Sequence, residues 1–472
     1  ENLINDESRN PQAIQLYFQK IKILNTQFVQ WVQTQNSRNP ETVNVQGMRS
    51  YLTHQKHIQD KYLRPPGRIL TTFGQGLDGS ADEMECETND PSKINFLSSK
   101  ILDKPNICMV TCGKRHILAC TVEGKVISWG SNDDGGLGRL TSDKKDEATP
   151  QEVFIGAPAI QLAAGDTQSL AVTVSGNVYF WGCFKDEQGT KWSMPSFGSK
   201  NNENLFKCIR KLPMRVQNIE NVKEVCCGAS TNYALTDNGV IYSWGIGDSC
   251  LFGRPVKSLK GSKNLHKLKF ILEDQLIPKP LNVLDDDAQC EVLFSAIGCG
   301  LRHVMAVDSR KMRVYGCGMN NQCQLGLSNC EKWVKLTRIK NLDDLEVVSV
   351  VGGKHHTLVL CSEGAVYSFG GSDKGQLGVG LPNQETCTAC PVRVFLPERS
   401  GRVVKISASG NSSVCLTDEG ECFSWGFVAE NGLERQFPLK RKVVVVKGKK
   451  MVDVSCGESY VASLISEAFN RM

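Results

Sequence analysis

The sequence lacks the long apolar segment that a membrane-spanning helix requires. No run of about 18 consecutive apolar residues occurs among its 472 residues, and no signal peptide is visible. An excess of one charge is also missing, because 55 Lys and Arg stand against 50 Asp and Glu, a net charge of +5. That balance does not by itself indicate nucleic-acid binding, so local clusters must decide. We therefore expect no membrane association.

The 20 cysteines show no framework spacing. Many lie in apolar, strand-like runs such as "VSCGESY" and "VCLTDEG", which is typical of small buried residues in a reducing compartment. The one C-x-x-C pair, Cys387 and Cys390, has no second pair nearby to complete a zinc site. We expect neither a disulfide scaffold, nor a metal, nor another cofactor.

A short unit recurs along most of the chain. An aromatic-Gly or related ending closes an apolar run seven times, at Gly74, Gly130, Gly182, Gly245, Gly318, Gly370 and Gly426. Before most of these endings lies a second apolar run and a polar turn with glycine, as in "HILACTVEGKVISWG". Two alternating runs around a turn whose glycine accepts a positive φ predict a β-hairpin.

A further strand precedes each hairpin, and a glycine-rich turn such as "NDDGGLG" often follows it. Four short strands in every 50 to 60 residues are typical of a propeller blade, whereas solenoid units are usually shorter and often helical. The last run, "VDVSCGESYVASLIS", is the first half of a repeat, and "RILTTFGQG" near the start is a second half. We therefore predict an all-β fold: a seven-bladed β-propeller over residues 67–466, closed by the N- and C-terminal strands, with a tail at 467–472.

Residues 1–66 do not carry the repeat. "SRNP" occurs twice, at 8–11 and 37–40, with Asn placed to cap a helix and Pro at its first position. Apolar residues follow the first copy at helical spacing and form a poorer stripe after the second. We predict an α-helical hairpin extension that packs on the propeller or on itself; a partner site is the alternative.

The repeat motifs resemble those of the regulator of chromosome condensation family. G-x-x-H, G-x-V-Y-S-W-G and N-D-x-G-x-L-G cover about residues 67–466. The resemblance implies a monomeric seven-bladed propeller that acts as a guanine-nucleotide exchange factor for the small GTPase Ran. It also implies a nuclear, chromatin-associated protein linked to nucleocytoplasmic transport and mitosis. The repeats alone indicate only the superfamily, which includes non-catalytic scaffolds, and that alternative stays open.

One repeat departs from its own pattern, because "CFKDEQGTKW" follows "YFWG" in place of the glycine-rich turn. The resemblance places the family's projecting hairpin, the wedge, at residues 184–192. It implies that these residues act on the GTPase: Phe184, Lys185, Asp186, Glu187, Gln188 and Gly189, with Thr190, Lys191 and Trp192 in the same contact. A stiff hairpin can favour the nucleotide-free GTPase by displacing contacts around its phosphates. An ordinary surface loop is the alternative.

The resemblance implies three further residues that face the GTPase. Asp166, in "AAGDTQSLAV", matches a family aspartate that matters for exchange, although a turn Asp commonly bonds its own backbone. His356 matches a family histidine on the GTPase-facing surface; the alternative is a structural role, as we expect for His116 and His303. Arg254 matches an arginine that contacts the GTPase, or else is a solvated arginine.

Other positions depart from the family. Ser230 lies where the family has an acidic residue, and Thr231 replaces a histidine. Gln168 and Tyr460 also stand where repeat histidines are common, and Asp78 lies one place from the family's acidic position. These departures bear on affinity for the GTPase and leave the fold unaffected.

Two runs are rich in lysine. The resemblance implies that the first, residues 257–269, binds acidic histone surface and DNA phosphate of the nucleosome through Lys257, Lys260, Lys263, Lys267 and Lys269. The second, "KRKVVVVKGKK" at 440–450, is either an import signal or a strand, since its centre is apolar. A solvated face is the alternative for each. No nucleophile or acid–base pair is evident, so we expect nucleotide exchange without covalent chemistry.

Overall fold

The structure is a computed structural model in which two compact units divide the chain, residues 1–64 and 65–472. It describes residues 69–74, 107–194, 206–257, 265–284, 291–310, 312–329, 331–381, 385–427, 436–443, 449–458 and 460–467. The predicted helical hairpin at 1–66 lies outside the described residues, as do Asp78 and residues 468–472. All described residues belong to the second unit.

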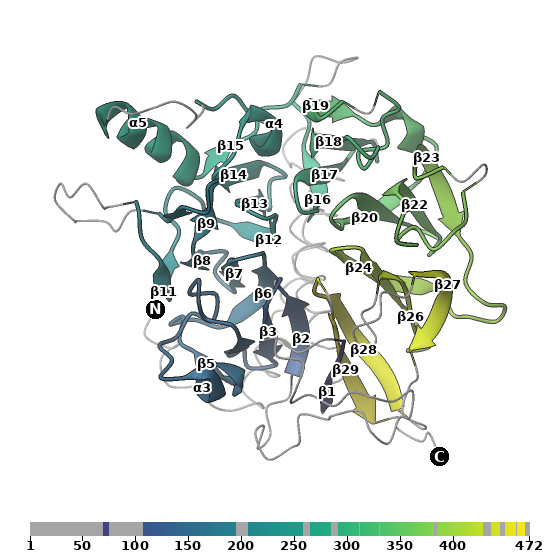
Figure 1. Ribbon diagram of the computed structural model, residues 1–472, viewed down its shortest axis with the longest axis horizontal. Coiled ribbons are helices and arrows are strands. Elements are labelled where there is room, and N and C mark those ends of the chain that lie inside the picture. The colour runs from purple at the N-terminus through teal and green to yellow at the C-terminus, as the bar shows by residue number, and fades with distance from the viewer. Residues whose placement is uncertain are drawn as a thin grey trace, which may run out of the picture. The chain divides into compact units, whose positions relative to one another are not determined.

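The described strands form six four-stranded antiparallel sheets, here called blades 1 to 6 (Figure 1). Blade 1 contains β2 (Ile107–Cys112), β3 (His116–Thr121), β4 (Val126–Gly130) and β5 (Gln151–Val153). Blade 2 contains β6 (Ala159–Ala164), β7 (Gln168–Thr173), β8 (Val178–Gly182) and β11 (Arg210–Arg215). Blade 3 contains β12 (Val222–Cys227), β13 (Thr231–Thr236), β14 (Ile241–Gly245) and β15 (Lys279–Pro280).

Blades 4 to 6 repeat this order. Blade 4 contains β16 (Phe294–Cys299), β17 (His303–Asp308), β18 (Val314–Met319) and β19 (Trp333–Arg338). Blade 5 contains β20 (Val347–Gly352), β21 (His356–Cys361), β22 (Val366–Gly371) and β23 (Cys387–Val394). Blade 6 contains β24 (Val403–Ser409), β25 (Ser412–Thr417), β26 (Cys422–Phe427) and β27 (Gln436–Val443).

A further sheet of three described strands joins the two ends of the propeller sequence. It is called the closing sheet and contains β28 (Lys449–Cys456), β29 (Tyr460–Glu467) and β1 (Ile69–Gly74). β1 pairs with β29 from Ile69↔Ile465 to Gly74↔Tyr460. The first strand of each sheet contacts the first strand of the next, and β28 contacts both β24 and β2. The prediction of an all-β propeller is confirmed, and the pairing of β1 with β29 agrees with the expected closure.

The remaining elements are short connections. They are the strands β9 (Phe184–Lys185) and β10 (Lys191–Trp192), the helices α3 (Lys144–Ala148), α4 (Ser249–Phe252) and α5 (Leu265–Leu276), and the 3-10 turn η2 (Lys340–Leu342). None of the helices in the described ranges is long and apolar enough to cross a membrane.

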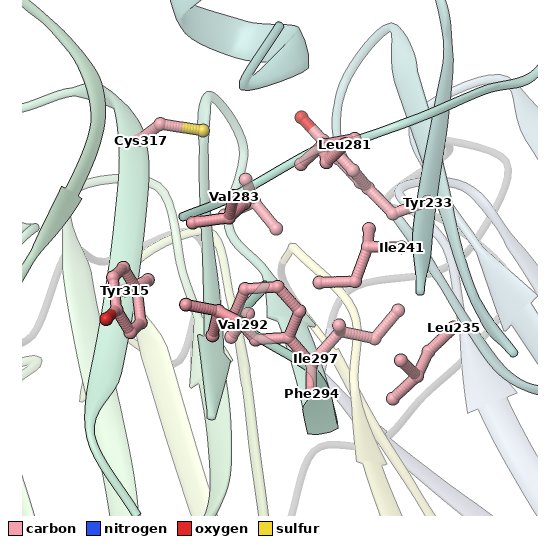
Figure 2. Close-up of a cluster of buried hydrophobic side chains, with 12 residues drawn as sticks. Tyr233, Leu235, Ile241, Leu281, Val283, Val292, Phe294, Ile297, Tyr315 and Cys317 are labelled. Carbon is pink, nitrogen blue, oxygen red and sulfur yellow. The ribbon is translucent and has the colours of Figure 1, made fainter. Parts of the chain in front are cut away.

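The hydrophobic core lies between neighbouring blades. Every residue of the second strand is buried in blades 1 to 6, because this strand is covered on both faces. Figure 2 shows one such layer, where Tyr233 and Ile241 of blade 3 face Phe294 and Tyr315 of blade 4. The Phe294 and Tyr315 rings meet edge to face with centroids 5.9 Å apart. Burying each large side chain contributes roughly 1.5–3 kcal/mol, so the blades stabilise one another.

The repeated aromatic-Gly ending has a steric origin. Gly182, which ends β8, has φ of 96°, a conformation that side chains other than glycine rarely adopt. A Cβ there would lie 2.3 Å from the carbonyl oxygen of Thr167, in the turn between β6 and β7. Gly130 has φ of 110° and faces Arg115 in the same way. The third strand therefore needs glycine where it passes that turn.

The repeat histidines connect one blade to the next. Nε2 of His116, His303 and His356 lies 2.8, 2.9 and 2.8 Å from the hydroxyl of Ser169, Thr357 and Ser413, respectively. Each hydroxyl belongs to the second strand of the following blade. Two of the departures from histidine make equivalent links, since Gln168 donates to Gly228 O at 3.0 Å and Tyr460 donates to Gly113 O at 2.7 Å. A hydrogen bond across the blade boundary is therefore kept at these two positions without histidine.

A buried carboxylate connects three sheets where the ring closes. Asp453 of β28 is completely buried, accepts from the Val110 amide of β2 at 3.0 Å, and pairs with Lys405 of β24. A buried acceptor that loses its partner is costly. Asp453 is therefore a polar link between blade 6, the closing sheet and blade 1.

We expect Asp453→Ala to lower the free energy of unfolding by about 3 kcal/mol, because it leaves the Lys405 ammonium and the Val110 amide without their carboxylate. Urea unfolding followed by circular dichroism measures this loss. Glu419→Ala is the control: Glu419 is 66% exposed and pairs with Lys450 at 3.4 Å, so its loss should cost less than about 1 kcal/mol. Equal effects of the two substitutions would contradict a special role for Asp453.

Candidate functional site

Residues 184–192 form a β-hairpin after the third strand of blade 2. Its two short strands pair antiparallel, Lys185 with Lys191 and Phe184 with Trp192. The Asp186 carboxylate organises the turn by accepting from the Thr190 amide at 2.8 Å and from the Trp192 indole N–H at 2.8 Å. An Asp that binds amides two to four residues onward stabilises a tight turn. This segment is therefore an ordered hairpin, here called the 184–192 hairpin.

The tip of this hairpin is exposed to solvent. Glu187, Gln188 and Gly189 are all exposed. Gly189 has φ of 79°, and a Cβ added there would have no atom within 4 Å. Glycine is therefore favoured at the tip by the backbone conformation and not by crowding, and the tip is open for contact with a partner.

The base of the hairpin is anchored in blade 2 and blade 3. Phe184 is fully buried and stacks on Phe180 of β8, with ring centroids 5.1 Å apart. The Thr167 hydroxyl donates to Cys183 O at 2.6 Å, immediately before the hairpin. From blade 3, the Ser230 hydroxyl donates to Lys185 O at 2.6 Å. Ser230, which departs from the family's acidic residue, thus holds the hairpin backbone here.

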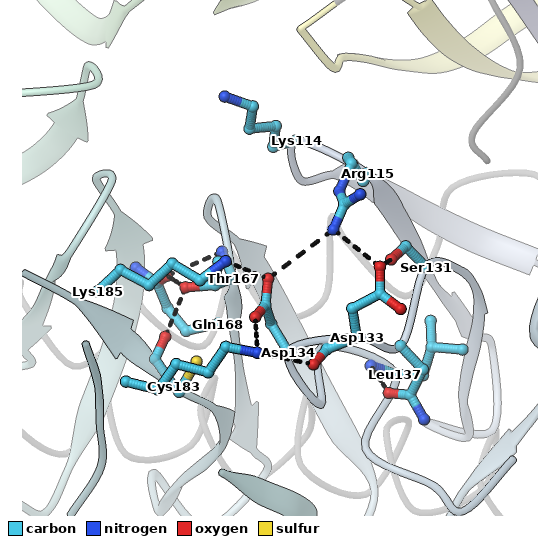
Figure 3. A network of polar contacts seen from close by, with 12 residues as sticks. Lys114, Arg115, Ser131, Asp133, Asp134, Leu137, Thr167, Gln168, Cys183 and Lys185 are labelled. Atoms are coloured by element: carbon cyan, nitrogen blue, oxygen red, sulfur yellow. Dashed lines mark hydrogen bonds and ion pairs between the residues drawn. The ribbon is translucent and has the colours of Figure 1, made fainter. Parts of the chain in front are cut away.

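Asp134 of blade 1 forms ion pairs with lysines on both strands of the hairpin, and Figure 3 shows the one with Lys185. Its two carboxylate oxygens lie 2.7 Å from Lys185 Nζ and 2.8 Å from Lys191 Nζ. Lys191 also donates to Asp133 O at 3.1 Å, and Arg115 lies 3.9 Å from Asp134. Burial opposes ionisation of Asp134, but the two lysines outweigh it and hold its pKa below the ordinary value. The contact is therefore an ion-paired clamp between two blades.

Asp166 lies beside this hairpin, in the turn that joins the first two strands of blade 2. Its neighbour Thr167 makes the hydrogen bond to Cys183 described above. Burial raises the pKa of Asp166 to about 6, against the opposing charges of Lys114 and Lys185. Lys114 in turn forms an ion pair of 3.1 Å with Glu458. The structure therefore brings Asp166 and the base of the hairpin together on the face that carries these turns.

His356 does not reach that face, which corrects the expectation from sequence. It is fully buried, and its Nε2 is occupied by Ser413 of blade 6. Burial lowers the pKa of His356 to about 3, so the ring is neutral at physiological pH. Its neighbour His355 is half-buried in the turn equivalent to that of Asp166. Of this histidine pair, His355 is therefore the one placed to meet a partner.

Arg254 is also buried, whereas the resemblance implied that it contacts the GTPase directly. Its guanidinium donates to Ser243 Oγ at 3.2 Å and to Asp274 O at 3.0 Å, and lies over the Phe252 ring. Arg139, the equivalent residue of blade 1, makes similar bonds to Ser128 O and Asp146. In blades 1 and 3 an arginine at this position therefore connects the third strand to the helix that follows it.

The first lysine-rich run is only partly described. Lys257 is exposed, with Nζ 3.9 Å from the centroid of the Phe270 ring, and Lys269 is exposed and 4.0 Å from Glu273. Lys267 lies in α5, whereas Lys260 and Lys263 fall outside the described residues. The second run, 440–450, begins within β27 and ends within β28, which agrees with its interpretation as strand.

Asp134 carries no signal that could be recognised in the sequence. It lies in an ordinary glycine-rich turn, "NDDGGLG", about fifty residues before the hairpin that it binds. The one related feature in the sequence is the pair of lysines in the hairpin, Lys185 and Lys191. Lysines with fixed side chains commonly pair with carboxylates, but the sequence does not show which carboxylate that is. Among the described residues, no three His, Cys, Asp or Glu side chains are arranged to hold a metal ion.

The ring of antiparallel four-stranded sheets, with one extra hairpin at a blade connection, defines the class of protein: a β-propeller built from repeats of about fifty residues. The family model described as RCC1-like domain matches residues 70–463. The chain belongs to this family.

Three relatives illustrate the range of proteins that it resembles. The regulator of chromosome condensation of Homo sapiens is 27% identical, over 88% of this chain and 93% of the relative. The ultraviolet-B receptor UVR8 of Arabidopsis thaliana is 28% identical, over 84% of each chain. The guanine nucleotide exchange factor SRM1 of Saccharomyces cerevisiae is 26% identical, over 76% of this chain and 79% of the relative. Proteins with different named activities are thus about equally similar.

We expect the stability of the protein to depend on pH through Asp166. Its pKa is about 6 in the folded protein against an ordinary value of 3.8, so the folded state holds the proton more tightly. That stabilisation is fully present below about pH 3.8 and is lost as the pH rises through 6. Asp166→Asn stays neutral, so its Tm relative to the unsubstituted protein should rise between pH 4 and pH 7.

Thermal unfolding at a series of pH values measures the difference. Glu363→Gln, a change at an exposed turn residue, serves as the control and should show a constant difference. A difference for Asp166→Asn that does not change between pH 4 and pH 7 would rule out this titration.

Proposed function

We propose that this protein is a guanine-nucleotide exchange factor for a Ran-like small GTPase, with the closing sheet as the seventh blade of its propeller. The observation that carries the proposal is the 184–192 hairpin, which combines an exposed tip with a base held by blades 1, 2 and 3. Its position beside Asp166 and the curated name of the yeast relative SRM1 support the same function.

A hairpin of this kind can release a nucleotide only if it is stiff. A GTPase holds nucleotide through backbone amides and Mg²⁺ around the phosphates, so an effective partner must favour the form that lacks those contacts. By linkage, bound nucleotide lowers the affinity of the GTPase for this partner by the same factor. An acceleration of 10⁴-fold corresponds to about 5.5 kcal/mol, which requires a broad interface as well as the tip. The ion pairs of Lys185 and Lys191 and the burial of Phe184 hold the hairpin in place. On contact, the conformation of the GTPase therefore changes and that of the hairpin does not.

The roles within the hairpin follow from exposure. Glu187, Gln188 and Gly189 are placed to contact the phosphate-binding region, while Asp186 shapes the turn that presents them. Asp166, together with the half-buried His355, supplies polar contact next to the hairpin and on the equivalent turn of blade 5. Lys185 and Lys191 are positioning residues, because their ammonium groups are engaged by Asp134. No step forms or breaks a covalent bond.

A non-catalytic propeller scaffold is the second candidate. Two observations favour it: His356 and Arg254 are occupied inside the fold, and the receptor UVR8 is as similar to this chain as the other relatives are. The two candidates differ in whether the protein changes the rate of nucleotide release.

Replacing residues 186–190 by Gly-Gly should slow release of labelled GDP from Ran by at least about 100-fold, or about 2.7 kcal/mol, because it removes the tip and keeps the propeller face. The measurement is stopped-flow release with the substituted and unsubstituted proteins. Asp134→Ala should reduce the rate less, about 10-fold, since the hairpin stays but loses its clamp. Glu363→Ala, at an exposed turn residue, is the control.

The outcome separates the two candidates. If the unsubstituted protein accelerates release and the Gly-Gly variant does not, the hairpin acts on the GTPase. If neither changes the rate while both bind Ran, the protein is a scaffold. Equal acceleration by both would reject the hairpin as the acting element.

We further propose that the protein is nuclear and attached to chromatin, with the exposed Lys257 and Lys269 near the nucleosome. The name of the human relative supports this assignment. Lysines that neutralise phosphates release counterions, so binding weakens with salt.

The double variant Lys257→Ala, Lys269→Ala should bind nucleosomes several-fold more weakly. The slope of log K against log salt is negative, and its magnitude should fall by about 2 in this variant. Binding titrations at several salt concentrations measure both quantities. Lys125→Ala, which removes an exposed lysine from a blade turn, should leave both nearly unchanged. The same slope in the double variant and the unsubstituted protein would contradict the assignment.

A further inference from the structure

Blade 4 has a cysteine at a turn position where blades 1 and 5 have glycine. The glycine-rich turn after the third strand reads "NDDGGLG" in blade 1, "SDKGQLG" in blade 5 and "NNQCQLG" in blade 4. The fourth residue has a positive φ in all three: 78° at Gly135, 72° at Gly375 and 56° at Cys323. An L-residue with a side chain is disfavoured in this conformation. Local backbone preference therefore does not explain Cys323.

The side chain at this position points to the next blade. In blade 1, a Cβ on Gly135 would lie 2.6 Å from Ile209 Cγ2 and 3.1 Å from Arg210 O. Arg210 begins β11, the outermost strand of blade 2. The repeat thus places the side chain of the fourth turn residue against the start of the following blade's outer strand.

In blade 4 the residue met at that place is another cysteine. Cys387 begins β23, the outermost strand of blade 5, and its Sγ lies 4.0 Å from Cys323 Sγ. Asn341 also bridges the two segments, since its amide donates to Gly326 O at 2.9 Å and to Ala389 O of β23 at 3.4 Å. Neither cysteine takes part in a disulfide in this structure. Forming one at the usual S–S length requires the sulfurs to approach by about 2 Å.

The two thiols differ in access to solvent. Cys323 is 4% exposed, whereas Cys387 is partly exposed and Cys390, three residues further on, is fully at the surface. A small oxidant can therefore reach Cys387 before it reaches Cys323. This is the arrangement in which one cysteine reacts first and its buried neighbour resolves the product.

We propose that Cys323 and Cys387 form a reversible disulfide that joins blades 4 and 5. The Cys387 thiolate attacks one sulfur of a low-molecular-weight disulfide, releasing one small thiol and forming a mixed disulfide. The Cys323 thiolate then attacks the Cys387 sulfur and releases the second small thiol. Two protein thiols give up two electrons and two protons, which the small disulfide takes up as it becomes two thiols. Excess small thiol reverses both steps.

The cross-link would be transient in a reducing compartment, where such bonds form on oxidation and are then removed. It would tie the turn of blade 4 to the outer strand of blade 5, at a boundary where the described contacts are otherwise non-covalent. This inference is independent of the exchange function, because it concerns only the state of two blades.

The test treats the full chain with oxidised glutathione, blocks the remaining thiols in denaturant, and identifies disulfide peptides by non-reducing mass spectrometry. We expect the protein to lose the two thiols of this pair. The Cys323–Cys387 peptide pair should appear, and dithiothreitol should remove it. Cys390→Ser should give the same product, since Cys390 is not part of the bond.

Cys323→Gly is the decisive variant, because glycine is the residue at this position in blades 1 and 5 and should fold without strain. With oxidised glutathione it should stop at a glutathione adduct on Cys387, with no internal cross-link. The proposal fails if the unsubstituted chain retains a blockable Cys323 thiol after oxidation. It also fails if that chain carries glutathione on Cys387, or joins Cys387 to Cys390 instead.

Discussion

Each blade depends on its neighbours for the burial of its second strand. The strand is apolar on both faces, as in β3 and β21, and one face can be covered only by the following sheet. A single four-stranded sheet would expose half of its core to water, so the fold is stable only as a ring. The polar links across each boundary follow the same rule, because the histidine of one blade finds its hydroxyl in the next. The pairing of β1 with β29 and the buried Asp453 matter for this reason: they let the last sheet cover the first.

The same dependence gives the 184–192 hairpin its rigidity. A two-residue strand pair in isolation has little stability of its own. Here blade 1 supplies Asp134, blade 2 supplies Phe180 under Phe184, and blade 3 supplies Ser230. Three blades that cannot move independently thus hold nine residues. An exposed tip on such a base can transmit force to a bound protein, which a loop fixed only at its ends cannot do.

The parts of the structure that could be predicted from sequence are those determined by local order. Hairpins with period-two alternation, the glycine required at positive φ and the break in the pattern at Phe184 are all visible in one repeat. The burial of His356 and Arg254 could not be predicted in this way. Their partners come from another blade or from a helix some twenty residues on, and a match to the family gives the position of a side chain but not its direction. The role of Asp134 could not be predicted either, because its sequence context is that of an ordinary turn residue and only the fold places it against Lys185.

Comparison between blades separates what the fold requires from what it does not. Arg139 and Arg254 make similar bonds in two blades, so an arginine there is explained by the propeller alone. Asp166 has no such explanation. Its place in the first turn is taken by Lys114 in blade 1, Ala229 in blade 3, Leu301 in blade 4, Lys354 in blade 5 and Glu458 in the closing sheet, so the turn accepts side chains of either charge or of none. A carboxyl whose pKa is raised to about 6 by burial works against the stability of the ionised protein. Neither the repeat nor stability calls for Asp166, which supports its proposed contact with a partner.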